Sequence, residues 1–354
     1  MYLSLIRGER RGILAGLARI GLRLVSIAYG WAVALRNLAF DRGWKKSFAA
    51  DVPVVCVGNL TLGGTGKTPC VEYLAGWFRD QGVRAAILSR GYGSEAGRND
   101  EALVLEENCP ETPHLQGADR VALARIAVEE LESELLILDD GFQHRRLRRD
   151  LDIVLLDATC PWGYGALFPR GLLRESPRGL RRAGLVVLTR CDLATGEQMS
   201  RLRSEVEKLA PGIGIVESEH RPAAWVNGTK RADLSAFRGR RIAGFCGLGN
   251  PDAFRRTLED LGGPVIAWRT FPDHHPYSRD DIEDLRRWAR ELPADAVIAV
   301  TQKDLVKIRL DRLGDRELWA LKIALKIRDG EELLRRKLTP LAPSPPVLKG
   351  RGPG

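Results

Sequence analysis

Short apolar runs alternate with amphipathic stretches through the first two thirds of this chain. The runs predict a strand that begins at Val54 and further strands at 85–89, 135–139, 153–157 and 186–189. Apolar side chains recur at helical spacing over 67–81 and 120–131, and Gly82 ends the first of these segments. Strands that alternate with helices predict an α/β fold, a mostly parallel sheet with helices on both faces.

A second alternating pattern follows a stretch rich in turn-forming residues. It predicts strands at 242–246, 265–268 and 296–300 and helices at 251–261 and 278–291. We therefore expect a core domain at 47–212, a linker at 213–240 and a smaller C-terminal α/β domain at 241–338. The proline-rich composition of 339–354 predicts a disordered tail.

The N-terminal segment 1–46 is both apolar and basic. It carries nine Arg or Lys side chains against Glu9 and Asp41, so it accounts for +7 of the net charge of +9. Its uncharged stretch, 24–35, is shorter than the roughly 20 residues that cross a bilayer. A basic amphipathic helix with a tryptophan, Trp31, is typical of a helix that lies on an anionic membrane surface. A helix that packs on the core is the alternative, and a cleaved signal peptide is disfavoured by the interrupting arginines.

Composition excludes several other classes of protein. The six cysteines are scattered without a C-x-x-C pair, which argues against a zinc site or a disulfide framework. Outside 1–46 the charges nearly balance, and no stacking motif accompanies them, so we expect no nucleic-acid partner. No sequence feature predicts an obligatory protein partner.

The strand from Val54 ends in a glycine-rich turn that leads directly into a helix. In such a turn, backbone N–H groups surround phosphate oxygens, a lysine adds positive charge, and a hydroxyl reaches a bound Mg²⁺. The pattern predicts a P-loop that binds a nucleoside triphosphate, although its first glycine is replaced. The expected binding residues are Thr61, Leu62, Gly63, Gly64, Thr65, Gly66, Lys67 and Thr68.

An acid pair, Asp139 and Asp140, closes the strand predicted at 135–139. A carboxylate at this position of a P-loop protein holds Mg²⁺ opposite the Thr68 hydroxyl, and either aspartate can do so. Arg90-Gly91-Tyr92-Gly93 closes another strand, and its two glycines permit close backbone approach to a ligand. Arg170 and Arg174 belong to a basic cluster whose geometry suits phosphate.

Together these motifs resemble one family, the tetraacyldisaccharide 4′-kinases of lipid A synthesis. The resemblance covers roughly residues 10–335. In this family a threonine is expected at the position of Thr61. The motifs that carry the resemblance are Gly58–Pro69, Leu88–Gly93, Asp139–His144, Arg148–Asp150, Phe168–Glu175, Phe271–Tyr277 and Thr301–Lys307.

The resemblance implies an enzyme that uses ATP and Mg²⁺ to phosphorylate the 4′-hydroxyl of a lipid disaccharide 1-phosphate. It implies work at the cytoplasmic face of the bacterial inner membrane, with 1–46 on the anionic surface and Arg170 and Arg174 toward the substrate's 1-phosphate. It also implies that Glu175 lies near the metal.

The family's catalytic aspartate, in a Gly-Asp-Glu-Pro motif, corresponds to Asp100, although the flanking glycine and proline are absent here. Its partner histidine corresponds to His274. As a base, Asp100 would accept the proton of the sugar hydroxyl, and His274 would orient it. Because Asp100 and His274 fall in different expected domains, we expect domain closure to assemble the pair.

Two other functions stay open from the residues alone. A P-loop GTPase of the metallochaperone type is one, because Thr189-Arg190-Cys191-Asp192 and Thr301-Gln302-Lys303-Asp304 loosely resemble a guanine-reading motif. A membrane-bound nucleotide sensor is the other, since it needs the phosphate-binding loop but no base.

Overall fold

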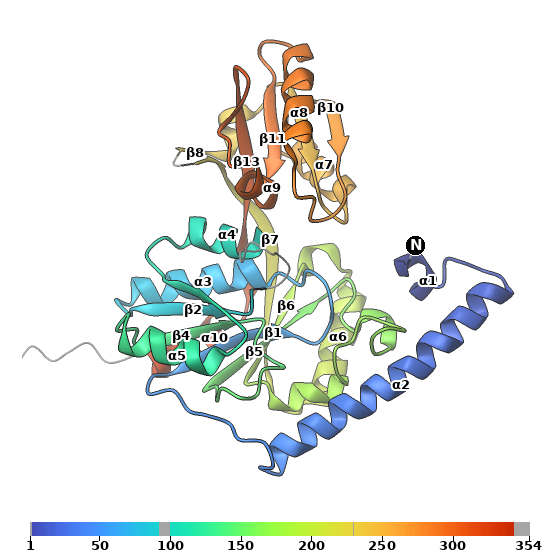
Figure 1. Ribbon diagram of the computed structural model, residues 1–354, viewed down its shortest axis with the longest axis vertical. Coiled ribbons are helices and arrows are strands. Elements are labelled where there is room, and N and C mark those ends of the chain that lie inside the picture. The colour runs from blue at the N-terminus through green and yellow to red at the C-terminus, as the bar shows by residue number, and fades with distance from the viewer. Residues whose placement is uncertain (1, 92–99, 229, 343–354) are drawn as a thin grey trace, which may run out of the picture. The chain divides into compact units, whose positions relative to one another are not determined.

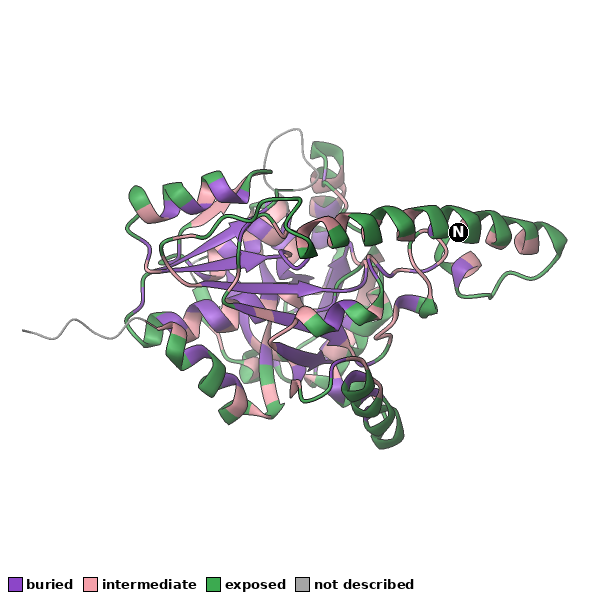
Figure 2. Cartoon of the chain, turned by 90° about the horizontal axis from the view of Figure 1, so that it is seen from below, coloured by how far each residue is buried: buried purple, intermediate pink, exposed green. Residues whose placement is uncertain are grey.

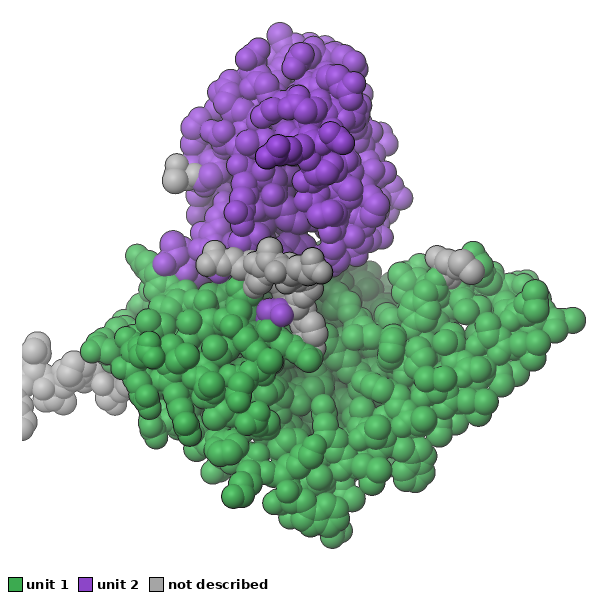
Figure 3. All heavy atoms as spheres, viewed as in Figure 1, with its two compact units in different colours: residues 1–90, 111–220, 325–354 green, residues 91–110, 221–324 purple. Residues whose placement is uncertain are grey.

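The computed structural model describes residues 2–91, 100–228 and 230–342. The chain divides into two compact units (Figure 3). The first unit comprises 1–90, 111–220 and 325–354, and the second comprises 91–110 and 221–324. Two features predicted from the sequence, Tyr92 as a substrate residue and the tail beyond 342, lie outside the described residues.

The first unit is built on a parallel sheet whose strands are buried on both faces (Figures 1 and 2). Its strand order is β7-β6-β5-β1-β4-β2-β3. Every residue of β1, β2, β4 and β6 is buried, as expected for aliphatic strands covered on both faces. The strands are β1 (Val54–Asn59), β2 (Ala85–Ser89), β3 (His114–Gln116), β4 (Leu135–Asp139), β5 (Leu151–Asp157), β6 (Leu185–Thr189) and β7 (Gly214–Asn227).

Helices cover the two faces of this sheet. Those of the first unit are α3 (Lys67–Asp80), α5 (Arg120–Glu129), α6 (Gly196–Leu209) and α10 (Glu331–Leu338). The side chain of Asp119 accepts hydrogen bonds from the first turn of α5, and Thr195 and Gln198 form a capping box at the start of α6. The predicted α/β class and the positions of α3, α5, β2 and β4 are confirmed.

Two helices precede β1, the short α1 (Tyr2–Ile6) and the 29-residue α2 (Ile13–Asp41). α2 is long and apolar enough to cross a membrane by length and composition, which the shorter uncharged stretch in the sequence did not suggest. Hydrogen bonds join one side of α2 to the segment 167–174 of the same unit. Ser26 Oγ donates to the carbonyl of Leu167, and Tyr29 Oη donates to that of Arg174. Most of its surface is exposed (Figure 2).

The strands of the second unit follow the order β10-β9-β11-β13-β7, and in the described part of the chain they belong to the same 13-stranded sheet through β7. Its strands are β9 (Ile242–Cys246), β10 (Val265–Thr270), β11 (Val297–Thr301) and β13 (Arg316–Asp329), with β8 (Lys230–Ala232) on β7 and β12 (Arg312–Leu313) on β13. Its helices are α4 (Asp100–Asn108), α7 (Pro251–Asp260), α8 (Arg279–Glu291) and α9 (Gln302–Ile308). The second α/β pattern of the sequence is thus confirmed.

The structure divides the chain differently from the sequence expectation in two places. The expected linker at 213–240 is wrong for most of its length, because β7 occupies Gly214–Asn227 and pairs with β6. The segment 91–110 was expected in the first domain, but it belongs to the second unit, where α4 packs on α9. Turn-forming residues marked the ends of β7, and its interior polar residues concealed the strand.

Candidate active site

The P-loop follows β1 and ends at the first residue of α3. Gly63 and Gly66 have backbone φ angles of 109° and 88°, in the region that favours glycine. A Cβ atom on Gly66 would lie 2.3 Å from the ring of His220, so space as well as backbone conformation requires glycine there. Around Gly63 and Gly64 nothing lies within 4 Å of such a Cβ, which leaves that part of the loop open to a ligand.

Polar side chains from β1, from the end of β6 and from the residue after β6 fix the shape of this loop. Asn59 Nδ2 donates to Thr65 Oγ1 over 2.9 Å, and Thr189 Oγ1 donates to the carbonyl of Thr65 over 2.9 Å. Arg190, whose guanidinium is also ion-paired with Asp157, donates to the carbonyl of Gly64 over 2.8 Å. Because these contacts hold two loop carbonyls and the Thr65 hydroxyl, the loop is preorganised before a nucleotide binds.

Asp140 lies between two cations. Its Oδ1 is 3.6 Å from Lys67 Nζ, and Arg174 Nη1 donates to both of its oxygens over 2.8 Å. Burial alone would raise the pKa of Asp140, but the charges of Lys67 and Arg174 together lower it below its ordinary value. The structure therefore joins the predicted lysine, one of the predicted acids and Arg174 in one site.

Asp139 ends β4, and Thr68 lies in the first turn of α3; both are buried. Burial, with a contribution from the charge of Asp139, raises the pKa of the nearby Cys70 thiol to about 12. Within the described ranges, no group of three His, Cys, Asp or Glu side chains forms a metal cage. Mg²⁺ commonly binds through one or two carboxylates together with phosphates and water, and the hard oxygens of Asp139 and Thr68 suit that mode.

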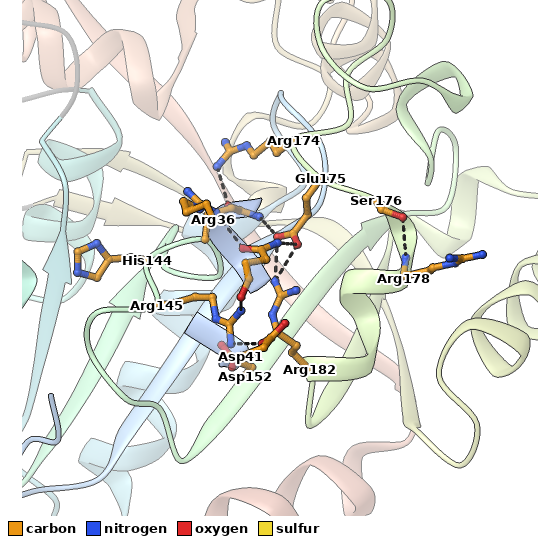
Figure 4. A network of polar contacts seen from close by, with 12 residues as sticks. Arg36, Asp41, His144, Arg145, Asp152, Arg174, Glu175, Ser176, Arg178 and Arg182 are labelled. Atoms are coloured by element: carbon orange, nitrogen blue, oxygen red, sulfur yellow. Dashed lines mark hydrogen bonds and ion pairs between the residues drawn. The ribbon is translucent and has the colours of Figure 1, made fainter. Parts of the chain in front are cut away.

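Glu175, expected near the metal, is held by side chains of the protein. Its carboxylate is buried and accepts four hydrogen bonds (Figure 4), two from Arg182 at 2.9 Å and one each from Gln143 at 3.0 Å and Asn37 at 3.2 Å. Both oxygens are therefore fully used by protein donors. Through Asn37, Glu175 joins α2 to the loop that carries Arg174, and its place near a metal stays a prediction.

Arg170 and Arg90 also differ in their surroundings from Arg174. The guanidinium of Arg170 donates to the carbonyl of Ile6 over 3.1 Å, and its backbone N–H donates to Ser26 Oγ, so it fastens α1 and α2. Arg90 is exposed at the end of β2.

The second unit contains the other expected pair. His274 Nδ1 lies 2.8 Å from Asp100 Oδ2, at the first residue of α4. The side chain of Asp100 is 7% exposed and that of His274 is 60% exposed. His274 has a φ of 58°, a conformation that non-glycine residues rarely adopt and that is often found at functional sites. Because both residues belong to one unit, the expectation that domain closure assembles the pair is wrong.

Sequence reasoning missed two residues that face the P-loop side of the first unit. Arg120 is buried at the start of α5, and burial followed by repulsion from Arg90 lowers its pKa. Burial, followed by the charge of Arg190, lowers the pKa of His220 to about 4, so its ring is neutral against Gly66. An arginine directly after the helix-capping Asp119 was a visible signal, whereas His220 lies in the unrecognised β7.

Comparison with known proteins agrees with this geometry. The tetraacyldisaccharide-1-P 4′-kinase family matches residues 18–341. Tetraacyldisaccharide 4′-kinase of Anaeromyxobacter dehalogenans strain 2CP-C is 42% identical over 93% of this chain and 92% of its own, and that of Syntrophus aciditrophicus is 39% identical over 81% and 83%. The crystal structure of LpxK from Aquifex aeolicus in complex with ATP superposes with a TM-score of 0.75 at 30% identity, covering 92% of this chain and 99% of that one. The chain belongs to the tetraacyldisaccharide 4′-kinase family of enzymes.

Proposed function

We propose that this enzyme transfers the γ-phosphoryl group of ATP to the 4′-hydroxyl of a tetraacyldisaccharide 1-phosphate. The acceptor follows from the names of its relatives, and ATP from the Aquifex aeolicus complex. The observation that carries the proposal is the hydrogen bond between Asp100 and His274, because a nucleotide sensor needs no such pair. It favours an enzyme that activates a hydroxyl.

The first unit would bind the triphosphate. Backbone N–H groups of residues 63–68 and the N-terminus of α3 would hold the phosphates, and Lys67 would neutralise charge on the transferred group. Thr68 and Asp139 would hold Mg²⁺, since the contacts of Asp140 with Lys67 and Arg174 favour Asp139 as the ligand. Bound Mg²⁺ would supply positive charge to the phosphate oxygens.

The second unit would supply the base. A sugar hydroxyl is a poor nucleophile at neutral pH, so the Asp100 carboxylate would accept its proton as the new O–P bond forms. His274 would hold that carboxylate in position through the 2.8 Å hydrogen bond.

The substrate carries acyl chains, so we propose that α2 brings the enzyme to the cytoplasmic face of the inner membrane. The exposed side of α2 carries large apolar residues, and arginines lie among them. The apolar residues are Ile13, Leu14, Leu17, Ile20, Leu24, Val25, Ile27, Trp31 and Leu35. Binding to vesicles that contain anionic lipid tests this: Leu17→Glu with Trp31→Glu should release the protein, and unchanged binding would contradict the proposal.

The reaction itself is tested with purified protein, labelled ATP and tetraacyldisaccharide 1-phosphate, followed by chromatography. A product with a second phosphate at the 4′ position is expected. Parallel assays with GTP and without lipid separate the other candidates. A preference for GTP would favour a GTPase, and ATP binding without lipid phosphorylation by folded protein would favour a sensor.

A further inference from the structure

The motif Thr301–Lys307 has no role in the site described so far, although it resembled a guanine reader. In the structure it forms the end of β11 and most of α9, and three of its side chains contact α4. Gln302 exchanges hydrogen bonds with Asn108 at 2.7 and 3.1 Å, and Lys303 Nζ donates to Glu101 Oε1 over 2.8 Å. The motif therefore fastens the helix that begins at Asp100.

The third contact reaches Asp100 itself. Lys307 Nζ lies 4.0 Å from Asp100 Oδ2, the oxygen that also meets His274 Nδ1 at 2.8 Å. On its other side Lys307 Nζ lies 3.4 Å from Asp304 Oδ1. The ammonium group thus stands between two carboxylates, and its side chain is only 13% exposed.

The carboxylate of Asp304 is in turn fixed by hydrogen bonds from one hydroxyl and one backbone N–H. It is fully buried, and its Oδ2 accepts hydrogen bonds from Thr301 Oγ1 at 2.6 Å and from the N–H of Gly247 at 3.1 Å. The ring of Tyr277 lies 5.4 Å below Lys307 Nζ. These contacts restrict the conformations of the Lys307 side chain, so its positive charge stays beside Asp100.

We propose that Lys307, held by Asp304, is a positioning residue for Asp100, which places a cation beside this carboxylate and keeps it aligned with His274. The inference rests on the proposed role of Asp100 as the base. Lys307 is the nearest cation among the charged groups that the structure sets around Asp100. Those groups are Glu101 on α4 itself, Asp273 and His274 on the loop after β10, and Lys303, Asp304 and Lys307 on α9.

Steady-state kinetics with the full-length enzyme over pH 5–9 tests the proposal. For Lys307→Met we expect the acidic limb of kcat to move up by about 1 pH unit, so that the loss of kcat grows toward about tenfold as the pH falls along that limb, because a cation within 4–6 Å favours the ionised carboxylate. KM for ATP should stay unchanged, since the substitution lies in the other unit. Lys307→Arg should restore most of kcat and the pH profile.

Gln302→Leu is the matched control, because it loosens the same pair of helices without touching Asp100. It should leave kcat and the pH profile unchanged, and thermal unfolding establishes that each variant is folded. A parental pH profile for Lys307→Met, or an equal loss with Gln302→Leu, would overturn the proposal. If Lys307→Met does not fold, Asp304→Asn gives the same readout, with a smaller shift in the same direction expected and an unshifted profile counting against it.

Asp100→Asn in the same series separates the two hypotheses. Full activity of Asp100→Asn would remove the proposed base and this inference together. Loss of activity in Asp100→Asn with an unaffected Lys307→Met would remove the positioning role alone.

Discussion

The two units each present a nearly buried carboxylate, and the two carboxylates have different neighbours. Asp140 in the first unit touches two permanent cations, Lys67 at 3.6 Å and Arg174 at 2.8 Å. Asp100 in the second unit touches a histidine at 2.8 Å and has a lysine at 4.0 Å. The first site gathers positive charge beside the P-loop, and the second holds one carboxylate beside an imidazole.

This difference separates two tasks that a kinase has to perform. A polyanionic phosphate chain needs surplus cations and a loop that does not rearrange. A hydroxyl acceptor needs a proton acceptor whose direction is fixed and whose charge is not cancelled by a tight ion pair. We therefore expect substitutions in the first unit to affect nucleotide binding and those in the second to affect turnover.

Asp100→Ala should have the largest effect. We expect kcat to fall by roughly 10²–10⁴-fold, because the acceptor hydroxyl loses its general base. ATP binding, measured by calorimetry, should change little. Activity close to that of the parent would mean that the second unit does not supply the base.

Lys67→Ala tests the opposite half of the comparison. Loss of the charge beside the phosphates should lower kcat by on the order of 10²–10³-fold and should also weaken ATP binding. Calorimetry beside steady-state kinetics distinguishes this from Asp100→Ala. If both variants bound ATP equally well, the division of tasks between the units would fail.

Gly66→Ala tests whether the loop needs its observed shape. A Cβ would meet the ring of His220, and a φ of 88° costs an L-residue about 1–2 kcal/mol. We expect a lower thermal midpoint and weaker ATP binding. Gly64→Ala is the control, because nothing lies within 4 Å of its Cβ and its φ is not positive, so it should unfold at the parental temperature.

His220→Gln should have the smallest effect, visible only as a change in pH dependence. The pKa of His220 is lowered to about 4 by burial and by Arg190, against about 6.5 in the unfolded chain. The unfolded state therefore binds the proton more tightly, so stability is complete above pH 6.5 and is lost as pH falls toward 4. The loss attributable to His220 is about 2–3 kcal/mol.

Urea unfolding at pH 7 and at pH 4.5 measures that loss. The parent should lose more stability between these pH values than His220→Gln does. His144, whose pKa burial and Arg120 also lower to about 4, should account for part of the remaining slope. An identical slope in the parent and in His220→Gln would mean that the ring is not kept neutral against the P-loop.

Local pattern carried much of what could be predicted. The elements β2, β4, β9 and α3 appear where hydrophobic periodicity predicted them, because each forms from residues adjacent in the chain. The P-loop was visible for the same reason, since it lies within one strand–loop–helix unit, and the acid pair was visible because it directly ends the apolar run of β4. β7 was missed because Glu217, Ser218 and Glu219 are polar and yet buried inside the sheet.

The sequence by itself determined the α/β class, the triphosphate-binding loop and the family to which the chain belongs. Tertiary structure alone decided that Asp100 and His274 share one unit and that Lys307 faces Asp100. It also decided that Glu175 accepts hydrogen bonds from Arg182, Gln143 and Asn37. The physical reason is that these contacts join residues far apart in the chain: between 7 and more than 200 positions separate them. Packing of one helix or loop against another, rather than any local spacing, sets which side chains meet.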